Sequence, residues 1–269
     1  MIDKGVLTAM FLRRTGFLPD IEHPVAFTEK VQWRKFYDHR DEFVNMADKQ
    51  HSKELARKRC KDVKVADSIF YGFKAEEVPF LYGTIIKITR ASNRNWRIDK
   101  ELSKSQKGRI IEGIKNGLAK PYGYEKGEWA YSAGKNGVIV EPIIEGTVTD
   151  FKYFVFDGKV KMIVLIRYDV GGITGLSLFD AEYNKIDVQY LPYPRQDHTV
   201  EISDSAKKKG IEIAEKLASN CDFLRVDLYY VQERDEWWFG EFTLYPTSGM
   251  IKFEPRSFDK ELGRYWRMR

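Results

Sequence analysis

Several residue types that commonly build binding sites are scarce in this chain of 269 residues. The two cysteines, Cys60 and Cys221, are too few and too far apart for a disulfide framework or a zinc cluster, so we expect two reduced thiols. The four histidines are scattered along the chain, which disfavours histidine catalysis and a histidine metal site; they are His23, His39, His51 and His198.

Long apolar runs are also missing. No run approaches the roughly 20 apolar residues of a membrane-spanning helix. The apolar stretch Gly5–Leu12 is short and is followed by Arg13 and Arg14 without a small-residue cleavage site. It therefore predicts an amphipathic first helix and no signal peptide. We expect a cytoplasmic protein without a transmembrane segment.

Neither sign of charge dominates the chain. Lysine and arginine number 45 against 40 acidic residues, and the net charge is +5. The basic clusters Lys53–Lys64 and 207–209 are interpreted as solvated helix faces, and no nucleic-acid-binding motif accompanies them. The 43% of hydrophobic residues is typical of a globular protein, with one large domain or two smaller lobes.

The pattern of apolar residues predicts helices mixed with antiparallel strands. The first eighty residues read mainly as helix, with Thr28 as a cap and a second helix over Glu42–Arg59. Later helices are expected over 105–118 and 203–219, the last capped by Ser203. Strands are expected over 84–89, 137–144, 151–156, 159–166, 223–231 and 237–244. This order predicts an α+β fold, because hairpins join neighbouring strands.

The last two strands predict a cluster of polar side chains on one face of a hairpin. If the turn centres on residues 233–235, Asp227 pairs with Glu241 and Arg225 with Thr243. Side chains alternate along strands, so these four share one face, with opposed Cβ atoms about 5 Å apart. The other face is apolar, with Leu224, Val226, Leu228, Gly240, Phe242 and Leu244. The polar face fits a divalent metal held by two carboxylates, or equally a buried arginine–carboxylate network.

A second hairpin is predicted at Asp157-Gly158, a strong turn signal. Pairing Phe156 with Lys159 predicts an apolar face of Phe151, Tyr153, Val155, Val160, Met162 and Val164. Asp150, Lys152, Phe154 and Lys161 then lie on the opposite face, toward a cleft or toward solvent.

Lys87 interrupts an otherwise apolar strand, and burying an ammonium group requires an anionic partner. A phosphate, an acidic side chain or an open strand face would each satisfy it. The polar loop after it, residues 89–95, can wrap a phosphate, but it lacks glycine and is a weak signal alone. The segment Tyr168–Pro194, rich in tyrosine, lines an acceptor pocket or forms a surface excursion.

These pieces, in this order, resemble the ATP-grasp superfamily. The strand with Lys87, the segment Val138–Gly146, and the Arg225-Val226-Asp227 and Glu241-Phe242-Thr243 pairs look like its phosphate, adenine and metal motifs. The stretch Phe27–Asp38, followed by residues 47–49, 149–154 and 238–243, looks more closely like the TupA-like ATP-grasp family. The resemblance covers most of the chain from about Phe27.

The resemblance implies two α+β lobes that clamp ATP behind a reduced helical N-terminal region. The divisions are residues 1–80 for that region, 81–147 for the small lobe, and 148–269 for the large lobe. It implies Mg²⁺ ligands and a set of ATP-binding residues. The metal ligands are Asp227, Glu241 and Thr243, and the catalytic groups are Arg225 and Lys87. The remaining nucleotide contacts are Lys49, Ser92, Asn93, Glu141, Ile143, Ile144, Glu145, Asp150 and Lys152.

The same resemblance implies a carboxylate–amine ligase that forms an amide through an acyl phosphate. Its implied substrates are a sugar carboxylate, such as a uronic acid, and an amino acid or amine, in bacterial envelope or capsule polysaccharide synthesis. The phosphate loop departs from the family by lacking its His and Gly, and Arg90 or Arg94 are candidate replacements. Alternative functions are a kinase, a non-catalytic nucleotide-binding scaffold and a glycosyltransferase, the last disfavoured because no Asp-x-Asp motif occurs.

Overall fold

The computed structural model of the protein describes residues 2–169, 172–196 and 201–269, so His198 lies outside the described residues. The helices are α1 (Lys4–Thr15), α2 (Phe27–Tyr37), α3 (Glu42–Met46), α4 (Lys49–Arg59), α5 (Lys104–Ala119), α6 (Trp129–Ser132), α7 (Asp204–Leu217) and α8 (Ser257–Tyr265). The strands are β1 (Phe70–Gly72), β2 (Thr84–Ile88), β3 (Asn95–Ile98), β4 (Val138–Pro142), β5 (Val148–Phe156), β6 (Lys159–Asp169), β7 (Gly172–Phe179), β8 (Gln189–Leu191), β9 (Phe223–Val231), β10 (Glu236–Thr243) and β11 (Lys252–Glu254).

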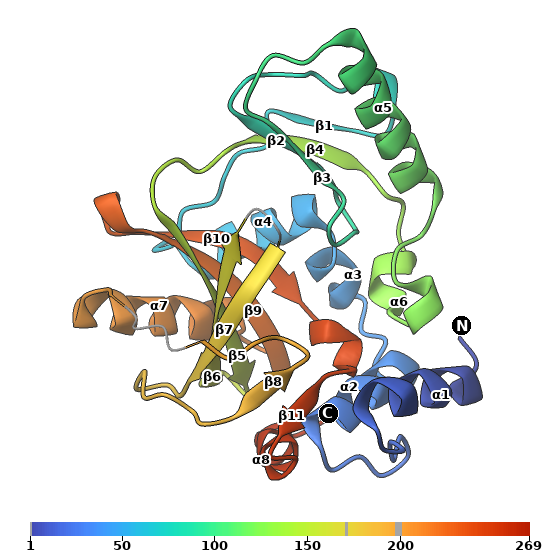
Figure 1. Cartoon of the computed structure of the whole chain (residues 1–269), viewed down its shortest axis with the longest axis vertical. Helices are drawn as coiled ribbons and strands as arrows, with labels where there is room; N and C mark the ends of the chain where they lie inside the picture. The colour runs from blue at the N-terminus through green and yellow to red at the C-terminus, as the bar shows by residue number, and fades with distance from the viewer. Residues whose placement is uncertain (1, 170–171, 197–200) are drawn as a thin grey trace.

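Two antiparallel sheets divide the molecule into an upper and a lower part in Figure 1. The small sheet has the order β1-β4-β2-β3, and the large sheet has the order β10-β9-β5-β6-β7. A third sheet consists of β11 and β8 only. The predicted α+β fold is therefore confirmed.

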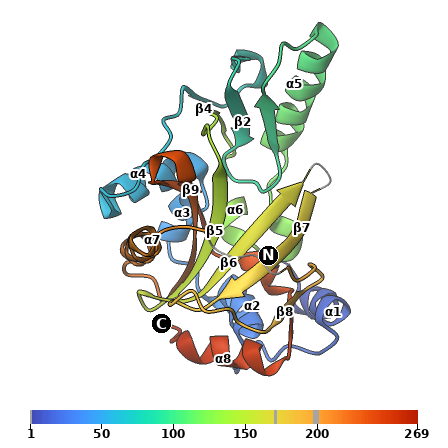
Figure 2. The same cartoon turned by 60° about the vertical axis from the view of Figure 1, so that its left-hand side comes forward.

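The small sheet builds its own core against α5. Ile86, Ile88 and Val140 from the strands are fully buried and pack with Ile114 of the helix. Ser103 caps α5 through its hydroxyl, which accepts a hydrogen bond from the Gln106 amide. This lobe is thus a separate packing unit above the large sheet (Figure 2).

The large sheet has one apolar face and one polar face. Leu224, Val226 and Leu228 are fully buried on the apolar face, which α7 covers. The helix approaches closely at Gly210, where an added Cβ would lie 2.5 Å from the Tyr153 hydroxyl and 2.6 Å from the Trp237 ring. The opposite face, with Arg225 and Asp227, is directed away from α7. The predicted apolar face of the last hairpin is confirmed except at Gly240, which lines the cavity, while Phe239 takes its place opposite Leu228.

The β5–β6 hairpin contains a bulge that the sequence analysis did not predict. Phe156 pairs with Lys159 as expected, but the register shifts by one residue between Val155 and Phe154. Because an extra residue reverses the facing of every later side chain, Val164 lies opposite Lys152 on the polar face. The predicted placement of Met162 and Val164 beside Tyr153 was therefore wrong.

Helix α2 packs against α8 and the turn at residues 246–249, and α4 packs against β10. Thr28 does not cap α2, because the helix begins at Phe27 and Ala26 is its N-cap. Thr28 instead donates its hydroxyl hydrogen to Asp259 at 2.6 Å and so fastens α2 to α8. The predicted single helix over Glu42–Arg59 is two helices, because Asp48 accepts the amide hydrogens of Gln50 and His51 and starts a new helix.

Strand β1 joins the small sheet although it precedes residue 81. The division of the chain at residues 80 and 147 stays a prediction. Across the described residues, no helix combines the length and the apolar character needed to cross a membrane.

Candidate active site

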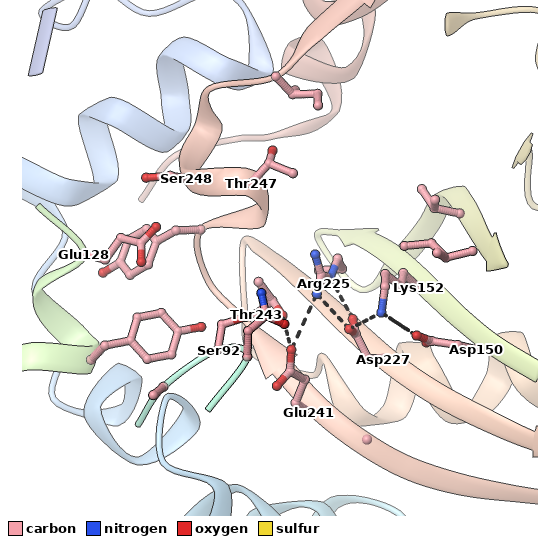
Figure 3. Close-up of a pocket in the computed structure, with 18 of the residues that line it drawn as sticks. Ser92, Glu128, Asp150, Lys152, Arg225, Asp227, Glu241, Thr243, Thr247 and Ser248 are labelled. Atoms are coloured by element: carbon pink, nitrogen blue, oxygen red, sulfur yellow. Dashed lines mark hydrogen bonds and ion pairs between the residues drawn. The ribbon is translucent and has the colours of Figure 1, made fainter. Parts of the chain in front are cut away.

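A cavity of about 810 Å³ lies between the two sheets, and side chains of both line it. The small lobe contributes Lys87 and the loop 91–95, and the large sheet contributes β5, β9 and β10. Figure 3 shows the polar side chains of the large sheet at its floor. A volume of this size is typical of pockets for small molecules.

The β9–β10 hairpin places four polar side chains together as predicted. Asp227 pairs with Glu241 and Arg225 pairs with Thr243. The register then shifts at Gly240, where an added Cβ would lie 3.0 Å from the Asp227 carbonyl oxygen. Glycine therefore permits the bulge at this point, directly beside Glu241.

Asp227 is the electrostatic centre of this cluster (Figure 3). Its carboxylate accepts hydrogen bonds from Arg225 Nε and Nη2, each at 2.7 Å, and from Lys152 Nζ at 2.8 Å. Burial raises the pKa of Asp227, but the positive charges of Arg225 and Lys152 outweigh burial and hold the pKa below its usual value. Asp227 is therefore ionised and doubly paired.

Lys152 also contacts Asp150, with 2.9 Å between Nζ and Oδ2. Burial raises the pKa of Asp150, and the Coulomb interaction with Lys152 lowers it only in part. The negative charge of Asp227 adds to the upward shift. The predicted nucleotide contacts Asp150 and Lys152 thus belong to one ion-pair network with Asp227.

Glu241 is more accessible than Asp227 and is held more loosely. Its side chain is 36% exposed, and the nearest cations are Arg225 Nη2 at 3.6 Å and Lys49 Nζ at 3.8 Å. The Thr243 hydroxyl lies 3.4 Å from Glu241 Oε1. Lys49 also donates a hydrogen bond to the Ala91 carbonyl at 2.6 Å, which connects α4 to the loop after β2.

Lys87 has an acidic side chain as its partner, which is one of the three alternatives that the sequence left open. It forms an ion pair with Glu141, and Lys53 of α4 forms an ion pair with the other oxygen of the same carboxylate. Burial raises the pKa of Glu141, but the charges of Lys87 and Lys53 outweigh it and lower the pKa overall. Burial lowers the pKa of Lys53, and Glu141 offsets part of that shift.

The loop between β2 and β3 turns toward the cavity. Ser92 and Asn93 line it, and Asn93 adopts a left-handed conformation with a φ of 58°. Arg90 does not face the cavity, because its guanidinium is buried against the Val44 and Ala130 carbonyls. Arg94 does line the cavity. Of the two arginines predicted as candidate phosphate ligands, only Arg94 faces the cavity.

Four predicted nucleotide contacts lie away from the cavity lining. Glu141 is occupied by the two lysines, and Ile143, Ile144 and Glu145 follow β4 toward the large lobe. The Ile143 amide donates to the Gly83 carbonyl, and the Glu145 carbonyl accepts from Arg234. Their assignment to adenine and ribose stays a prediction.

The structure brings further residues to the cavity that the sequence analysis did not identify. Lys53 does not line the cavity: it is buried beside Glu141, contrary to its interpretation as part of a solvated helix face, and its i, i+4 spacing from Lys49 was an available signal. The tyrosine-rich segment does reach the pocket, through Leu176, Tyr190, Pro192 and Tyr193, while Val170 and Gly171 lie outside the described residues. Nothing in the sequence pattern singled out Glu128, Tyr122 and Tyr131, which line the cavity opposite the hairpin.

The donors of the hairpin suit magnesium that is bound together with phosphate. Asp227, Glu241 and Thr243 offer only oxygen atoms, which Mg²⁺ prefers. No group of three acidic, histidine or cysteine side chains in the described ranges forms a metal site by itself. Mg²⁺ usually binds through one or two carboxylates plus substrate phosphates, so this pair fits when phosphate oxygens supply the remaining ligands.

Comparison with known proteins finds similar solved structures and a matching family. Solved structures that resemble it include D-alanine–D-alanine ligase from Helicobacter pylori, with 15% identity, a TM-score of 0.48, and coverage of 82% of this chain and 61% of that one. The ATP complex of the Bacillus anthracis D-alanine–D-alanine ligase has 14% identity and a TM-score of 0.43, with coverage of 74% and 53%.

The ATP complex of carboxyaminoimidazole ribonucleotide synthase from Aspergillus clavatus has 14% identity and a TM-score of 0.45, with coverage of 74% and 45%. The chain thus spans about half the length of several of the structures that it resembles. No curated protein matches it. The model of the TupA-like ATP-grasp family matches residues 29–267, nearly the whole chain. The chain therefore belongs to the TupA-like ATP-grasp family.

Proposed function

We propose that this protein is an ATP- and Mg²⁺-dependent ligase that joins a carboxylate to an amine. The observation that carries the proposal is the gathering of Arg225, Lys152 and Lys49 around Asp227 and Glu241 in a cavity that Lys87 also lines. Membership of an ATP-grasp family supports ATP as the phosphoryl donor. The reaction is accordingly assigned to the cytoplasm, where ATP is available.

The cations of the cluster would bind and neutralise the phosphate groups. At present each is paired with a carboxylate, so an incoming phosphate exchanges one anionic partner for another and leaves no buried cation unpaired. Ser92 and Asn93 would add contacts from the loop after β2. Asp227 and Glu241, with Thr243, would hold Mg²⁺, which supplies charge neutralisation between the phosphates.

The chemistry follows from this arrangement of charge. The acid substrate would take the γ-phosphoryl group of ATP to give an acyl phosphate, and the amine would then displace phosphate to give the amide. Phosphoryl transfer depends mainly on positioning and charge neutralisation, which this site offers. Arg225, buried beside Asp227, would stabilise negative charge on the transferred group.

The adenosine part would extend toward the segment after β4. We assign the backbone at Ile143 and Ile144 to adenine, with Glu141 at its edge, and Glu145 or Asp150 to the ribose. Glu141 would keep Lys53 as its partner when Lys87 turns to a phosphate.

The acceptor would enter beside the tyrosines of the β8 segment. Tyr190 and Tyr193 stack with 6.1 Å between ring centroids and line the cavity with Tyr229. Flat aromatic rings that also carry hydroxyl groups suit a sugar ring. We therefore propose a uronic acid, with an amino acid or amine as its partner, in synthesis of envelope or capsule polysaccharide.

The first test is thermal unfolding with ATP and MgCl₂, separately and together. A ligand at a hundredfold its dissociation constant stabilises by about 2.7 kcal/mol, which shifts the midpoint measurably. Glu241→Gln should lose the Mg²⁺-dependent part of the shift, whereas the control Glu236→Gln, on the same strand but paired with Lys64, should keep it. If wild-type protein shows no shift with ATP and Mg²⁺, the proposal is wrong.

The second test identifies the product. Wild-type protein is incubated with ATP, MgCl₂, D-glucuronic or D-galacturonic acid and a panel of amino acids, and masses are measured. A ligase gives an amide, which is the sum of acid and amine less one water, together with inorganic phosphate. A stable product heavier than the acid by one phosphate group would instead identify a kinase.

A further inference from the structure

Four carboxylates line the cavity among the residues that the structure describes, and one stands apart from the other three. Asp150, Asp227 and Glu241 belong to the cationic cluster of the large sheet. Glu128 lies across the pocket from Asp150, on the side of Ser248 (Figure 3). This carboxylate therefore faces the reaction space without being part of the proposed phosphate site.

Glu128 is held in place by a preorganised turn. Its side chain is nearly buried, at 5% exposure, and its amide donates to the Gly123 carbonyl at 2.9 Å. Gly123 has a φ of 76°, and an added Cβ there would lie 2.8 Å from the Glu128 Cβ. The Ser248 side chain lowers the pKa of the carboxylate. The position of Glu128 is thus fixed by its surroundings.

Behind Glu128 lies a fully buried lysine of α2, Lys35. Its Nζ donates to Gln32 Oε1 at 2.9 Å, the Ser248 carbonyl at 2.8 Å and the Ser248 hydroxyl at 2.9 Å. These bonds also fix Thr247 and Ser248 in left-handed conformations, with φ of 48° and 59°. Such strained residues persist only where the surrounding structure holds them, and they occur often at functional sites.

Amide formation requires a proton acceptor in this cavity. An amino group is mainly protonated at neutral pH, and the ammonium form has no lone pair with which to attack. No histidine or cysteine lies among the described residues that line the cavity. Burial raises the pKa of Tyr131 well above its usual value, and Lys49 is bonded to the Ala91 carbonyl on the phosphate side.

We propose that Glu128 marks the amine subsite and is the general base that takes the proton from the incoming ammonium group, with Lys35 and Ser248 as its positioning residues. This inference rests on the proposed ligase function. It assigns the amine to the side of the cavity near α6 and the acid to the side near the hairpin cluster.

The surroundings of Glu128 make its carboxylate a stronger base than an exposed one. Burial raises its pKa, and the charges of Lys35 and Lys126 and the Ser248 hydroxyl lower it only in part. A base is most effective when its pKa approaches the working pH. The titratable groups that interact with it electrostatically are Lys35, Lys126, Tyr122, Tyr131 and Tyr245.

Two protons leave the attacking nitrogen during the proposed step. The Glu128 carboxylate takes one proton from R–NH₃⁺, and the freed lone pair forms the C–N bond with the acyl carbon. The bond between that carbon and the phosphate oxygen breaks, and inorganic phosphate leaves with the electron pair. The second proton of the nitrogen passes to the departing phosphate, and Glu128 then loses its proton to solvent.

The test compares two nucleophiles in Glu128→Gln. Hydroxylamine is largely unprotonated at neutral pH and needs no base, whereas an amino acid does. With D-glucuronic or D-galacturonic acid and ATP, the variant should lose about 10²–10⁴-fold of the rate with the amino acid and keep hydroxamate formation within a few fold. The control Glu125→Gln, an exposed residue of the same turn, should retain both rates.

Other results overturn the inference. Equal losses with both nucleophiles, or no loss with either, mean that Glu128 is not the base. If wild-type protein makes neither amide nor hydroxamate, the proposed function fails and this inference fails with it. Should Glu128→Gln not fold because the buried charge of Lys35 is no longer compensated, the double variant Glu128→Gln with Lys35→Met removes both charges and must show the same dependence on the nucleophile.

Discussion

Replacing Asp227 by Asn tests whether the ion-pair network of the hairpin stabilises the protein before any ligand binds. The substitution keeps the shape of the side chain and removes its charge. Asp227 is 1% exposed and accepts three hydrogen bonds from Arg225 and Lys152. After the change, Lys152 keeps Asp150 at 2.9 Å, whereas Arg225 keeps only Glu241 at 3.6 Å.

The expected loss of stability follows from these remaining contacts. Removing one partner of a buried ion pair costs about 3–5 kcal/mol. Both cations retain a second carboxylate, so we expect the lower end, about 3 kcal/mol. For a chain of this size that corresponds to a fall in Tm of roughly 6–12 °C. The control Asp99→Asn breaks an exposed pair with Arg97 and should cost less than about 1 kcal/mol.

The pH dependence separates a charge effect from a packing effect. The pKa of Asp227 is lowered in the folded protein, so its contribution is present above the unfolded pKa and is lost as the pH falls through the folded pKa. The difference between wild type and Asp227→Asn should shrink between about pH 5 and pH 2. Urea unfolding followed by tryptophan fluorescence measures it. A variant as stable as wild type at pH 7, or a difference unchanged at low pH, would refute the reasoning.

Three further changes probe other parts of the molecule. Glu141→Gln leaves the buried Lys53 without its carboxylate partner and should destabilise the protein by about 3 kcal/mol. Adding Lys53→Met should recover most of this loss. Urea unfolding of both variants measures it, and no recovery would contradict the pairing. Gly263→Ala places a Cβ 2.0 Å from the Val25 carbonyl oxygen and should destabilise the protein by more than about 1 kcal/mol. Gly108→Ala has open space around it and should stabilise α5 by about 1 kcal/mol. Equal shifts of the two thermal midpoints would refute this. Burial raises the pKa of Asp259 to about 6, so the folded protein favours its protonated form. The free energy of unfolding is therefore higher below the unfolded pKa and should fall by about 3 kcal/mol as the pH rises through 6. Urea titrations between pH 4 and 7 should show this fall in wild-type protein and not in Asp259→Asn.

The sequence predicted which residues pair at the polar cluster of the β9–β10 hairpin, Asp227 with Glu241 and Arg225 with Thr243. The alternation of apolar and polar residues placed Arg225 and Asp227 on one face, but next to the turn the strands pair one residue out of the predicted register, with Val231 opposite Glu236. The bulge at Gly240, which was not predicted, restores the pairing of Asp227 with Glu241. The pairing of β5 with β6 failed after two residues, because the bulge has no glycine or other turn residue to mark it.

Contacts between distant segments were beyond local patterns. Arg90 has the side chain of a phosphate ligand, yet it is buried against α3 and α6. The tertiary fold, not the local sequence, brings those two helices to it. Glu128 and Lys35 are 93 residues apart and show no periodic signal. The helix break at Asp48 was a missed local signal, because an aspartate before Lys49 is an ordinary N-cap.

The sharing of Glu141 by two lysines has a consequence for how the site opens and closes. Lys87 can leave the carboxylate without creating an isolated buried anion, because Lys53 stays behind on the other oxygen. The strand lysine is therefore a movable contact and the helix lysine a fixed one. If nucleotide binds here as proposed, its entry and exit would leave α4 and β4 joined, so turnover would not loosen the attachment of the N-terminal helices to the small sheet.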